Sequence, residues 1–224
     1  MGLVTNVLKI FLPKEAIFQR ELRRMERDYH VNELRFKGMW KHKPNSGEYP
    51  APHGVKQAHI LSYKEKYNIN VLVETGTFLG IMVDAMKNKF QRVVSIEIAD
   101  GLYKRAKKMF ENNLNVEIRL GDSGVVLEDV LKTLNEPAIF WLDGHYSGSV
   151  TGMADIETPI MAELKHIFLH SVQDHVILID DARLFNGTRD YPELDELEQE
   201  VRKYWKNCYF KVDNDAIVIL KNHH

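Results

Sequence analysis

Val71 to Gly80, with the sequence VLVETGTFLG, is the stretch that decides the fold of this chain. A run of apolar, mostly β-branched residues ends at Glu74, and a Thr-Gly-Thr turn follows at once. After Gly80 the spacing of the apolar residues becomes helical. A glycine in such a turn lets the backbone approach a ligand closely, and the helix start offers unpaired N–H groups. The stretch therefore predicts a site for a small charged metabolite, with an ordinary strand-to-helix turn as the alternative.

Strands and helices are expected to alternate along most of the chain. Strands are predicted at about residues 71–74, 92–98, 116–120, 138–142, 176–179, 209–212 and 216–220, with helical patterns between most of them. Such alternation calls for a mostly parallel sheet covered on both faces, whereas the last two strands, joined by a tight turn, must run antiparallel. We predict an α/β fold with a mostly parallel seven-stranded sheet and a C-terminal antiparallel hairpin strand.

The N-terminal part of the sequence lacks the alternation of strands and helices that is predicted for the rest. Residues 1–54 are predicted to form a helical extension and a loop, and residues 55–224 form the main domain. The helical spacing runs from Lys14 to about Leu34, and residues 37–54, rich in Pro, Gly and Lys, are expected to be a loop. The helix would pack on the main domain or on a second subunit, which makes a homodimer one expectation. The apolar residues 3–12 leave peripheral membrane contact as a weaker alternative.

Composition narrows the classes of partner. The 224 residues are 44% hydrophobic, enough for one α/β domain with an extension. Net charge is only −2, but residues 1–70 carry 13 Lys/Arg against 7 Asp/Glu. This basic segment either meets an acidic substrate, a phosphate-bearing partner or a membrane surface, or is a solvated helix face. The charge is otherwise dispersed, and no D/N-P-P-Y/F tetrapeptide occurs, so a nucleic-acid substrate is not expected.

Cysteine usage and hydropathy point to the cytoplasm. Cys208 is the only cysteine, which excludes an intramolecular disulfide and a thiol-rich metal cluster. No apolar run approaches the length of a transmembrane segment, and no secretory signal pattern opens the sequence. We therefore predict a cytoplasmic protein.

Acidic residues recur where the predicted parallel strands end. They are Glu74, Glu97, Asp122, Asp143, Asp180 and Asp181. In an open α/β sheet a ligand binds beyond the carboxyl ends of the strands, so these side chains are expected to line one site. An acid ending the second strand can accept both hydroxyls of a ribose, the role predicted for Glu97. Asp122 can accept from the amine of an adenine while the Ser123 N–H points at a ring nitrogen, although Asp122 is also a fair helix N-cap.

The last three acids suggest a metal site. Asp143 follows the buried run AIFWL, and Asp180-Asp181 follows VILI, so adjacent strand ends would bring three carboxylates together. Buried like charges repel unless a cation or protons neutralise them, and oxygen ligands of this kind suit Mg²⁺ or another hard divalent ion. The alternative is that an aspartate of the pair caps the next turn while Asp143 pairs with a lysine or arginine.

Three stretches resemble the signatures of one family. ETGTFLG is similar to the E-x-G-x-x-x-G signature of cation-dependent small-molecule O-methyltransferases, including the aromatic residue at Phe78. FWLDGHYSG and LIDDARLFNGT resemble the second and third signatures, and the Asp-Asp pair is the form used by macrocin-type sugar O-methyltransferases. The resemblance covers roughly residues 70–220. It implies the Rossmann-like fold of class I methyltransferases, which use S-adenosyl-L-methionine (SAM).

The resemblance also implies a site and a substrate class. SAM would contact Glu74, Thr75, Gly76, Thr77, Phe78, Gly80, Glu97, Asp122, Ser123 and Asp143, with Glu74 and the Gly76 turn facing its methionine half. Mg²⁺ or another divalent cation would be held by Asp143, Asp180 and Asp181. The acceptor would be a hydroxyl group of a small molecule or sugar.

One position departs from the family pattern. Plant and catechol enzymes carry a lysine three residues after the first metal aspartate, where this chain has Tyr146. His145 is then the candidate general base, and it joins Asp143 as a predicted catalytic residue. A structural histidine beside Tyr146 is the alternative. Residues 147–154 would form a substrate lid or a plain connector.

Two other classes of function remain open at this point. One is a metal-dependent hydroxylase on the same scaffold, which would keep the carboxylate cluster. The other is a non-catalytic SAM-binding or assembly module that uses the basic N-terminal helix. A fold does not by itself select among these three functions.

Overall fold

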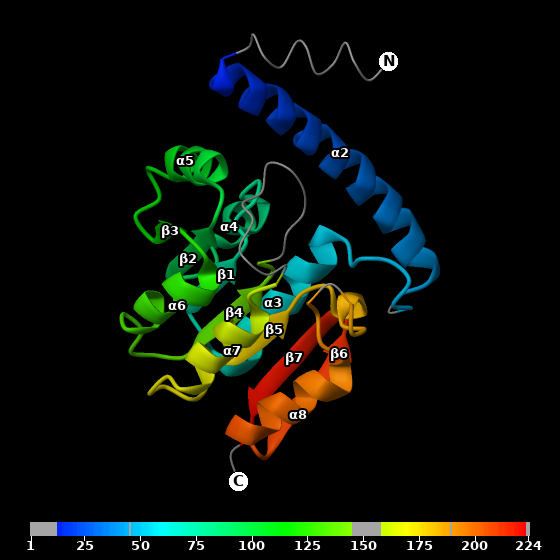
Figure 1. The fold of residues 1–224 in the computed structure, drawn as a ribbon, viewed down its shortest axis with the longest axis vertical. Coiled ribbons are helices and arrows are strands. Elements are labelled where there is room, and N and C mark those ends of the chain that lie inside the picture. Colours follow the sequence, from blue (N-terminus) through cyan, green and yellow to red (C-terminus); the bar gives the residue numbers. More distant parts are fainter. Residues whose placement is uncertain (1–12, 45, 145–157, 189, 223–224) are drawn as a thin grey trace.

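A seven-stranded sheet organises the part of the chain that the computed structural model describes, residues 13–44, 46–144, 158–188 and 190–222. Its order is β3-β2-β1-β4-β5-β7-β6 (Figure 1). The bounds are β1 Val71–Thr75, β2 Arg92–Glu97, β3 Val116–Leu120, β4 Ala138–Leu142, β5 Val176–Ile179, β6 Cys208–Asp213 and β7 Ala216–Lys221. β1 to β5 are parallel, and β7 runs antiparallel to both β5 and β6. The predicted sheet and its terminal hairpin are confirmed.

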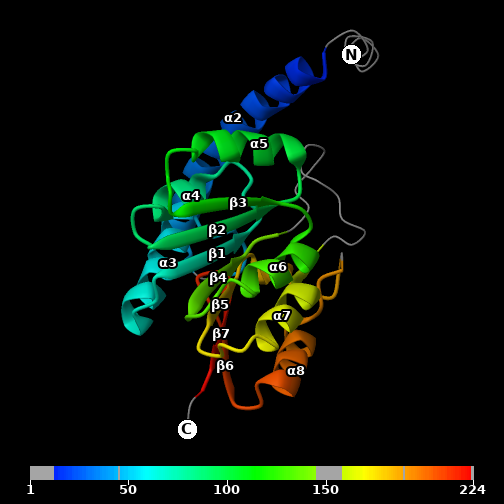
Figure 2. The same cartoon turned by 90° about the vertical axis from the view of Figure 1, so that its left-hand side faces the viewer.

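Helices cover both faces of the sheet (Figure 2). On one face lie α3 (His53–Tyr67), α4 (Ile81–Met86) and α5 (Asp100–Met109). On the other lie α6 (Ser123–Leu131), α7 (Ile160–Phe168) and α8 (Leu194–Tyr204), and a short 3₁₀ turn, η1 (Ala182–Leu184), follows β5. Covering a parallel sheet on both faces buries its central strands β1, β4 and β5 completely, which explains the continuous apolar runs of β4 and β5.

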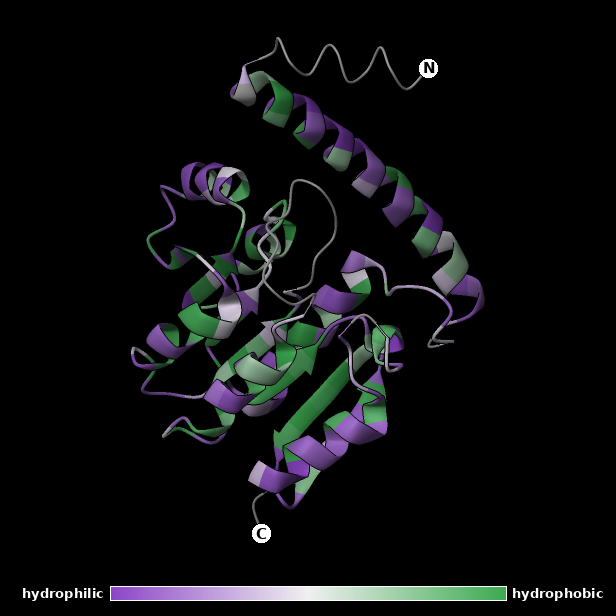
Figure 3. Ribbon diagram, in the orientation of Figure 1, coloured by the Kyte–Doolittle hydropathy of each residue, from purple (hydrophilic) through white to green (hydrophobic). Residues whose placement is uncertain are grey.

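The core is divided by the sheet into two apolar clusters. Side chains alternate along β4, so Phe140 and Leu142 join the cluster under α6, α7 and α8, whereas Ile139 and Trp141 join the one under α3, α4 and α5. All five residues of β4 are buried. Figure 3 shows the same contrast in hydropathy, with apolar central strands and a largely polar α2 and α8.

Helix α2 (Lys14–His42) is longer than the sequence predicted. The expectation of a loop from residue 37 was wrong for residues 37–42, because the single glycine, Gly38, does not stop the helix and the ring of Trp40 is buried. The helix ends at His42, and its C-cap Lys43 is not helical because a residue that precedes a proline, here Pro44, disfavours the helical region. The remaining described residues as far as Pro52 are irregular, as predicted, but the loop prediction was also wrong for residues 53–54, which begin α3.

Helix α2 packs against the main domain beside the glycine turn. Leu22 is buried with Leu79 and Leu102, and the ring of Phe18 lies against Gly101 of α5. Glu26 forms an ion pair with Arg105 of α5 at 2.9 Å. The extension therefore reaches the region where the predicted ligand site lies.

The possible membrane contact concerned residues 3–12, which lie outside the described residues. None of the helices in the described part of the chain combines the length and apolar character needed to cross a bilayer. The proposed homodimer stays a prediction.

Candidate functional site

The glycine turn after β1 is pressed against the end of β4. Gly76 has a φ of +85°, and its N–H donates to the carbonyl of Ile96 at 2.9 Å. A Cβ at Gly76 would overlap the carbonyl oxygen of Asp143. Both the left-handed backbone and this close approach require glycine, so the turn is held directly against the predicted metal aspartate.

Glu97, at the end of β2, holds the other side of this turn. Its Oε2 accepts the N–H of Phe78 at 2.7 Å, and its Oε1 accepts the N–H of Ala99 at 2.9 Å. Burial raises the pKa of Glu97, while these backbone hydrogen bonds act in the opposite direction. The backbone N–H of Ile98 also interacts with this carboxylate, and because a carboxylate has about four lone-pair positions, acceptor capacity is left for a hydroxyl.

Glu74 is buried at the base of the turn. The hydroxyl of Ser95 donates to its Oε2, and Ser95 Oγ lies 2.6 Å from Thr77 Oγ1. Burial is the main reason that the pKa of Glu74 is raised to about 8, and the charges of Asp143 and Glu97 act in the same direction. This carboxyl is therefore largely protonated near neutral pH and can donate as well as accept a hydrogen bond.

Asp122 and Ser123 begin α6. Asp122 is its N-cap, accepting the N–H of Gly124 at 2.8 Å, so the structural alternative for this residue holds in the ligand-free protein. Beneath them lies Glu163 of α7, only 1% exposed, which sequence analysis did not single out. Burial raises the pKa of Glu163 to about 7. A second acid that changes protonation near neutral pH thus lies below the predicted adenine position.

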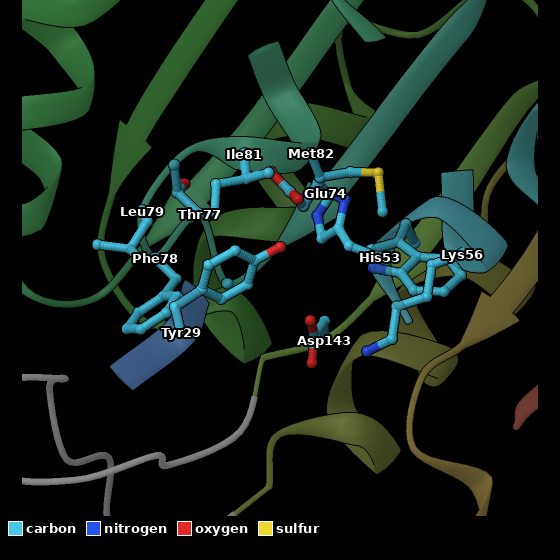
Figure 4. Close-up of a pocket in the computed structure, with 12 residues that line it drawn as sticks. Tyr29, His53, Lys56, Glu74, Thr77, Phe78, Leu79, Ile81, Met82 and Asp143 are labelled. Atoms are coloured by element: carbon cyan, nitrogen blue, oxygen red, sulfur yellow. The ribbon is translucent and has the colours of Figure 1, made fainter. Parts of the chain in front are cut away.

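A cavity of about 130 Å³ opens between the glycine turn and the N-terminal helices (Figure 4). Its lining comprises Tyr29, His53, Lys56, Glu74, Gly76, Thr77, Phe78, Leu79, Ile81, Met82, Trp141 and Asp143. It is smaller than typical ligand pockets, which have volumes of roughly 300–1,000 Å³. Glu97, Asp122 and Ser123 lie outside this lining.

The far wall of the cavity comes from residues that sequence analysis missed. The rings of Tyr29 in α2 and His53 in α3 form a T-shaped contact with centroids 6.2 Å apart, and the Tyr29 hydroxyl points into the cavity (Figure 4). Burial raises the pKa of Tyr29 to about 12 and lowers that of His53 to about 4, so both are neutral near pH 7.

The three predicted metal aspartates do come together. Asp143, Asp180 and Asp181 each offer one carboxylate oxygen, and these oxygens lie within 4.8 Å of one another. Asp180 and Asp181 are buried, and burial raises the pKa of Asp180 well above its usual value. Three hard oxygen donors at this separation fit a divalent ion such as Mg²⁺ in type and spacing.

Two cationic side chains also reach this cluster. Lys56 Nζ pairs with Oδ2 of Asp180 and lies 3.6 Å from Oδ1 of Asp181. Arg183 Nη1 donates to Oδ1 of Asp181 at 2.7 Å and pairs with Asp215. The neighbouring carboxylates raise the pKa of Lys56 although its burial opposes this, so the ammonium is charged. The cluster is thus a partly compensated acidic site.

The structure does not address every predicted site residue. His145, the candidate base, and residues 147–154, the candidate lid, lie outside the described residues. Thr75 and Gly80 lie in the turn region without lining the cavity: Thr75 Oγ1 accepts the N–H of Asp143 at 3.2 Å, and Gly80 has a φ of +75°. The remaining predicted residues lie at the carboxyl edge of the sheet, as expected.

Comparison with solved structures places the architecture in a known class. The strand order, the glycine turn and the terminal hairpin form the Rossmann-like fold of class I methyltransferases. A candidate caffeoyl-CoA O-methyltransferase from Staphylococcus aureus matches with a TM-score of 0.51 and 13% identity, over 86% of this chain and 100% of that one. A methyltransferase from Podospora anserina, solved with S-adenosylhomocysteine, matches with a TM-score of 0.51 and 14% identity, over 95% and 99% of the chains.

A third similar structure is the methyltransferase domain of bacterial CtHen1, with a TM-score of 0.51 and 12% identity over 74% of this chain and 97% of that domain. No protein-family model and no curated protein matches the sequence. At these identities the likeness establishes the fold, and the chemistry must be argued from the site.

Proposed function

We propose that this protein is a SAM-dependent O-methyltransferase that acts on a hydroxyl group of a small molecule or sugar and uses Mg²⁺ or another divalent ion. The observation that carries the proposal is the contact between Gly76 and the backbone of Asp143. It joins the glycine turn, where the methyl donor would bind, to the carboxylate cluster, where the acceptor hydroxyl would be held.

The donor side of the site is built from the turn and the neighbouring strand ends. Glu97 has lone pairs for the ribose hydroxyls, and Asp122 with Ser123 begins α6 at the position suited to adenine. The methionine end would face Glu74 and Gly76, both of which line the cavity.

The acceptor side is built from the cluster and the N-terminal helices. Asp143, Asp180 and Asp181 would hold the divalent ion, which supplies Lewis-acid activation and orientation of a hydroxyl group. Tyr29 and His53 close the cavity opposite Asp143, which would exclude water from the methyl group. The extension would thereby form one wall of the acceptor site.

The reaction would be a single displacement. The acceptor oxygen attacks the methyl carbon, the carbon–sulfur bond breaks, and its electron pair leaves with S-adenosylhomocysteine. The hydroxyl proton passes to a general base, for which His145 stays the candidate. A sulfonium methyl group is already activated, so the residues above contribute mainly by positioning the two reactants.

A non-catalytic SAM-binding module is the second candidate, and one observation favours it. Lys56 and Arg183 already compensate part of the charge that a metal ion would neutralise. A metal-dependent hydroxylase shares the cluster but needs no SAM, so SAM binding separates it from the other two functions.

The test combines binding with methyl transfer. Calorimetric titration with SAM is expected to show one site per chain, and transfer from methyl-labelled SAM to a panel of catechols and hydroxylated sugars is expected to require Mg²⁺ and stop with EDTA. Asp180→Asn should lose transfer while keeping SAM binding, because Asp180 belongs to the cluster and not to the donor side. Absence of SAM binding by the wild-type chain would refute the proposal, and SAM binding without transfer would favour the binding module.

A further inference from the structure

Lys56 occupies an unusual position for a lysine. It lies in the first turn of α3, its side chain is 15% exposed, and its ammonium pairs with Asp180, whose side chain is 1% exposed. Figure 4 shows the same ammonium directed towards Asp143. A lysine is seldom buried unless a charge partner compensates it, and here the partners are the three candidate metal ligands.

The other nearby cation, Arg183, contacts only one edge of the cluster among the residues that the structure describes. Arg183 is shared between Asp181 and Asp215, whose carboxylate oxygens also accept the backbone N–H groups of Arg183 and Ala51. Among the described residues, Lys56 is the cation whose printed ion pairs reach both Asp180 and Asp181. The ammonium of Lys56 therefore lies at the position where a divalent ion would neutralise the carboxylates.

The backbone of α3 holds Lys56 in place. The N–H of His53, the first residue of α3, lies 3.1 Å from both carboxylate oxygens of Glu33 in α2. The position of the helix start is thus fixed by α2, while four rotatable bonds in the Lys56 side chain still allow the ammonium to move. The cavity that Lys56 already lines offers space for it.

We propose that Lys56 is the internal cation of the Asp143–Asp180–Asp181 cluster, and that a divalent ion binds there only by displacing the Lys56 ammonium from Asp180. The inference rests on the metal site of the proposed function, and it adds an element of regulation. The chain's own lysine weakens metal binding, and metal binding moves a positive charge towards the cavity.

The competition is measurable through metal affinity. Mn²⁺ binding to the full chain, followed by the loss of the free-ion EPR signal, is expected to be at least about tenfold tighter in Lys56→Met than in the wild type, because a buried ion pair no longer has to be broken. Lys56→Gln, which keeps a polar group beside Asp180 without the charge, should tighten binding in the same direction. It is the variant to use if Lys56→Met does not fold.

Lys64→Met is the matched control. Lys64 lies on the same helix but bonds to Asn70 and lies over the ring of Phe90, so its loss should leave Mn²⁺ affinity unchanged. A second readout is thermal unfolding: without metal, Lys56→Met should unfold at a lower temperature than the wild type, and Mn²⁺ should raise its midpoint by more than it raises that of the wild type.

Equal or weaker Mn²⁺ binding by folded Lys56 variants, or no Mn²⁺ binding by any of the chains, would overturn the inference. SAM titration of the same samples keeps this result apart from the proposed function. Wild-type SAM binding together with unchanged Mn²⁺ affinity rejects only the role of Lys56, whereas a wild-type chain that does not bind SAM rejects the methyltransferase itself.

Discussion

The backbone N–H of Phe78 donates to Oε2 of Glu97 at 2.7 Å, so the turn after β1 is tied to the acidic end of β2. Phe78 adopts a φ of +48°, an uncommon conformation for a residue with a side chain, and this hydrogen bond helps to hold it. One carboxylate therefore supports the turn and also faces the predicted ribose position. The turn of the proposed donor site is therefore held by hydrogen bonds of the chain itself.

Replacing Glu97 by glutamine should damage both the turn and the binding of SAM. An amide has only one accepting end, so the N–H of either Phe78 or Ala99 loses its acceptor, at a cost of about 1–3 kcal/mol. We expect SAM affinity to fall at least about tenfold, by calorimetry. Glu117→Gln, whose carboxylate makes partly exposed ion pairs with Arg92 and Arg119, is the control and should change little. Unchanged SAM affinity in Glu97→Gln would remove this residue from the site.

Gly76→Ala should abolish the donor site. The new methyl group would meet the carbonyl of Asp143, and the left-handed φ adds about 1–2 kcal/mol. Gly38→Ala is the matched control: it lies inside α2 with open space around it, so it should stabilise the chain by roughly 0.5–1 kcal/mol. Chemical denaturation and SAM titration of both variants test this. Normal SAM binding by Gly76→Ala would show that the turn does not contact the ligand.

Glu74 should make stability fall as pH rises. Its pKa is about 8 in the folded chain against an ordinary value of 4.5, so the folded state binds more protons than the unfolded state between these values. Its contribution declines by up to about 1.4 kcal/mol per pH unit as pH rises through this window. Glu74→Gln lacks this loss, so its stability relative to the wild type should increase from about pH 5 to about pH 8. Urea unfolding at several pH values measures the difference, and parallel profiles would contradict the assignment.

Arg105 should couple the N-terminal helix to the turn. Its guanidinium donates to the carbonyl of Leu79 at 2.9 Å and pairs with Glu26 of α2. Arg105→Met should destabilise the chain by about 1–2 kcal/mol and weaken SAM binding several-fold, because the Leu79 carbonyl loses a donor and α2 loosens. Lys104→Met, on the same helix but paired only with exposed Asp100, is the control. Denaturation and SAM titration measure both variants. If Arg105→Met and Lys104→Met have the same stability and the same SAM affinity, α2 does not influence the site through Arg105.

Much of the fold was readable from local pattern. The strands AIFWL and VILI were predicted at their observed bounds because a strand covered on both faces must be apolar throughout. The acids that follow them met at one edge because parallel strands all end there. The C-terminal end of α2 was predicted too early, because the Pro, Gly and Lys residues of segment 37–54 were taken to indicate a loop although the helix continues to His42.

The positions of Lys56 and Tyr29 in the site could not be predicted from local sequence patterns. Lys56 pairs with Asp180, 124 residues away in sequence, and the helix HGVKQAHI carries no pattern that marks this lysine. Tyr29 fits the apolar stripe of α2 as an ordinary packing residue. Which side chains meet at the site depends on how α2 and α3 pack on the sheet, and the local spacing of residues in the sequence does not determine this packing.

A crystal structure with S-adenosylhomocysteine and Mn²⁺ tests the central claim most directly. The account predicts the ribose hydroxyls on Glu97, the adenine beside Asp122 and Ser123, and the amino-acid end at the Gly76 turn. It also predicts an anomalous Mn²⁺ signal among the three aspartates, with Lys56 moved from Asp180. A ligand bound away from both Glu97 and the Gly76 turn would contradict the account.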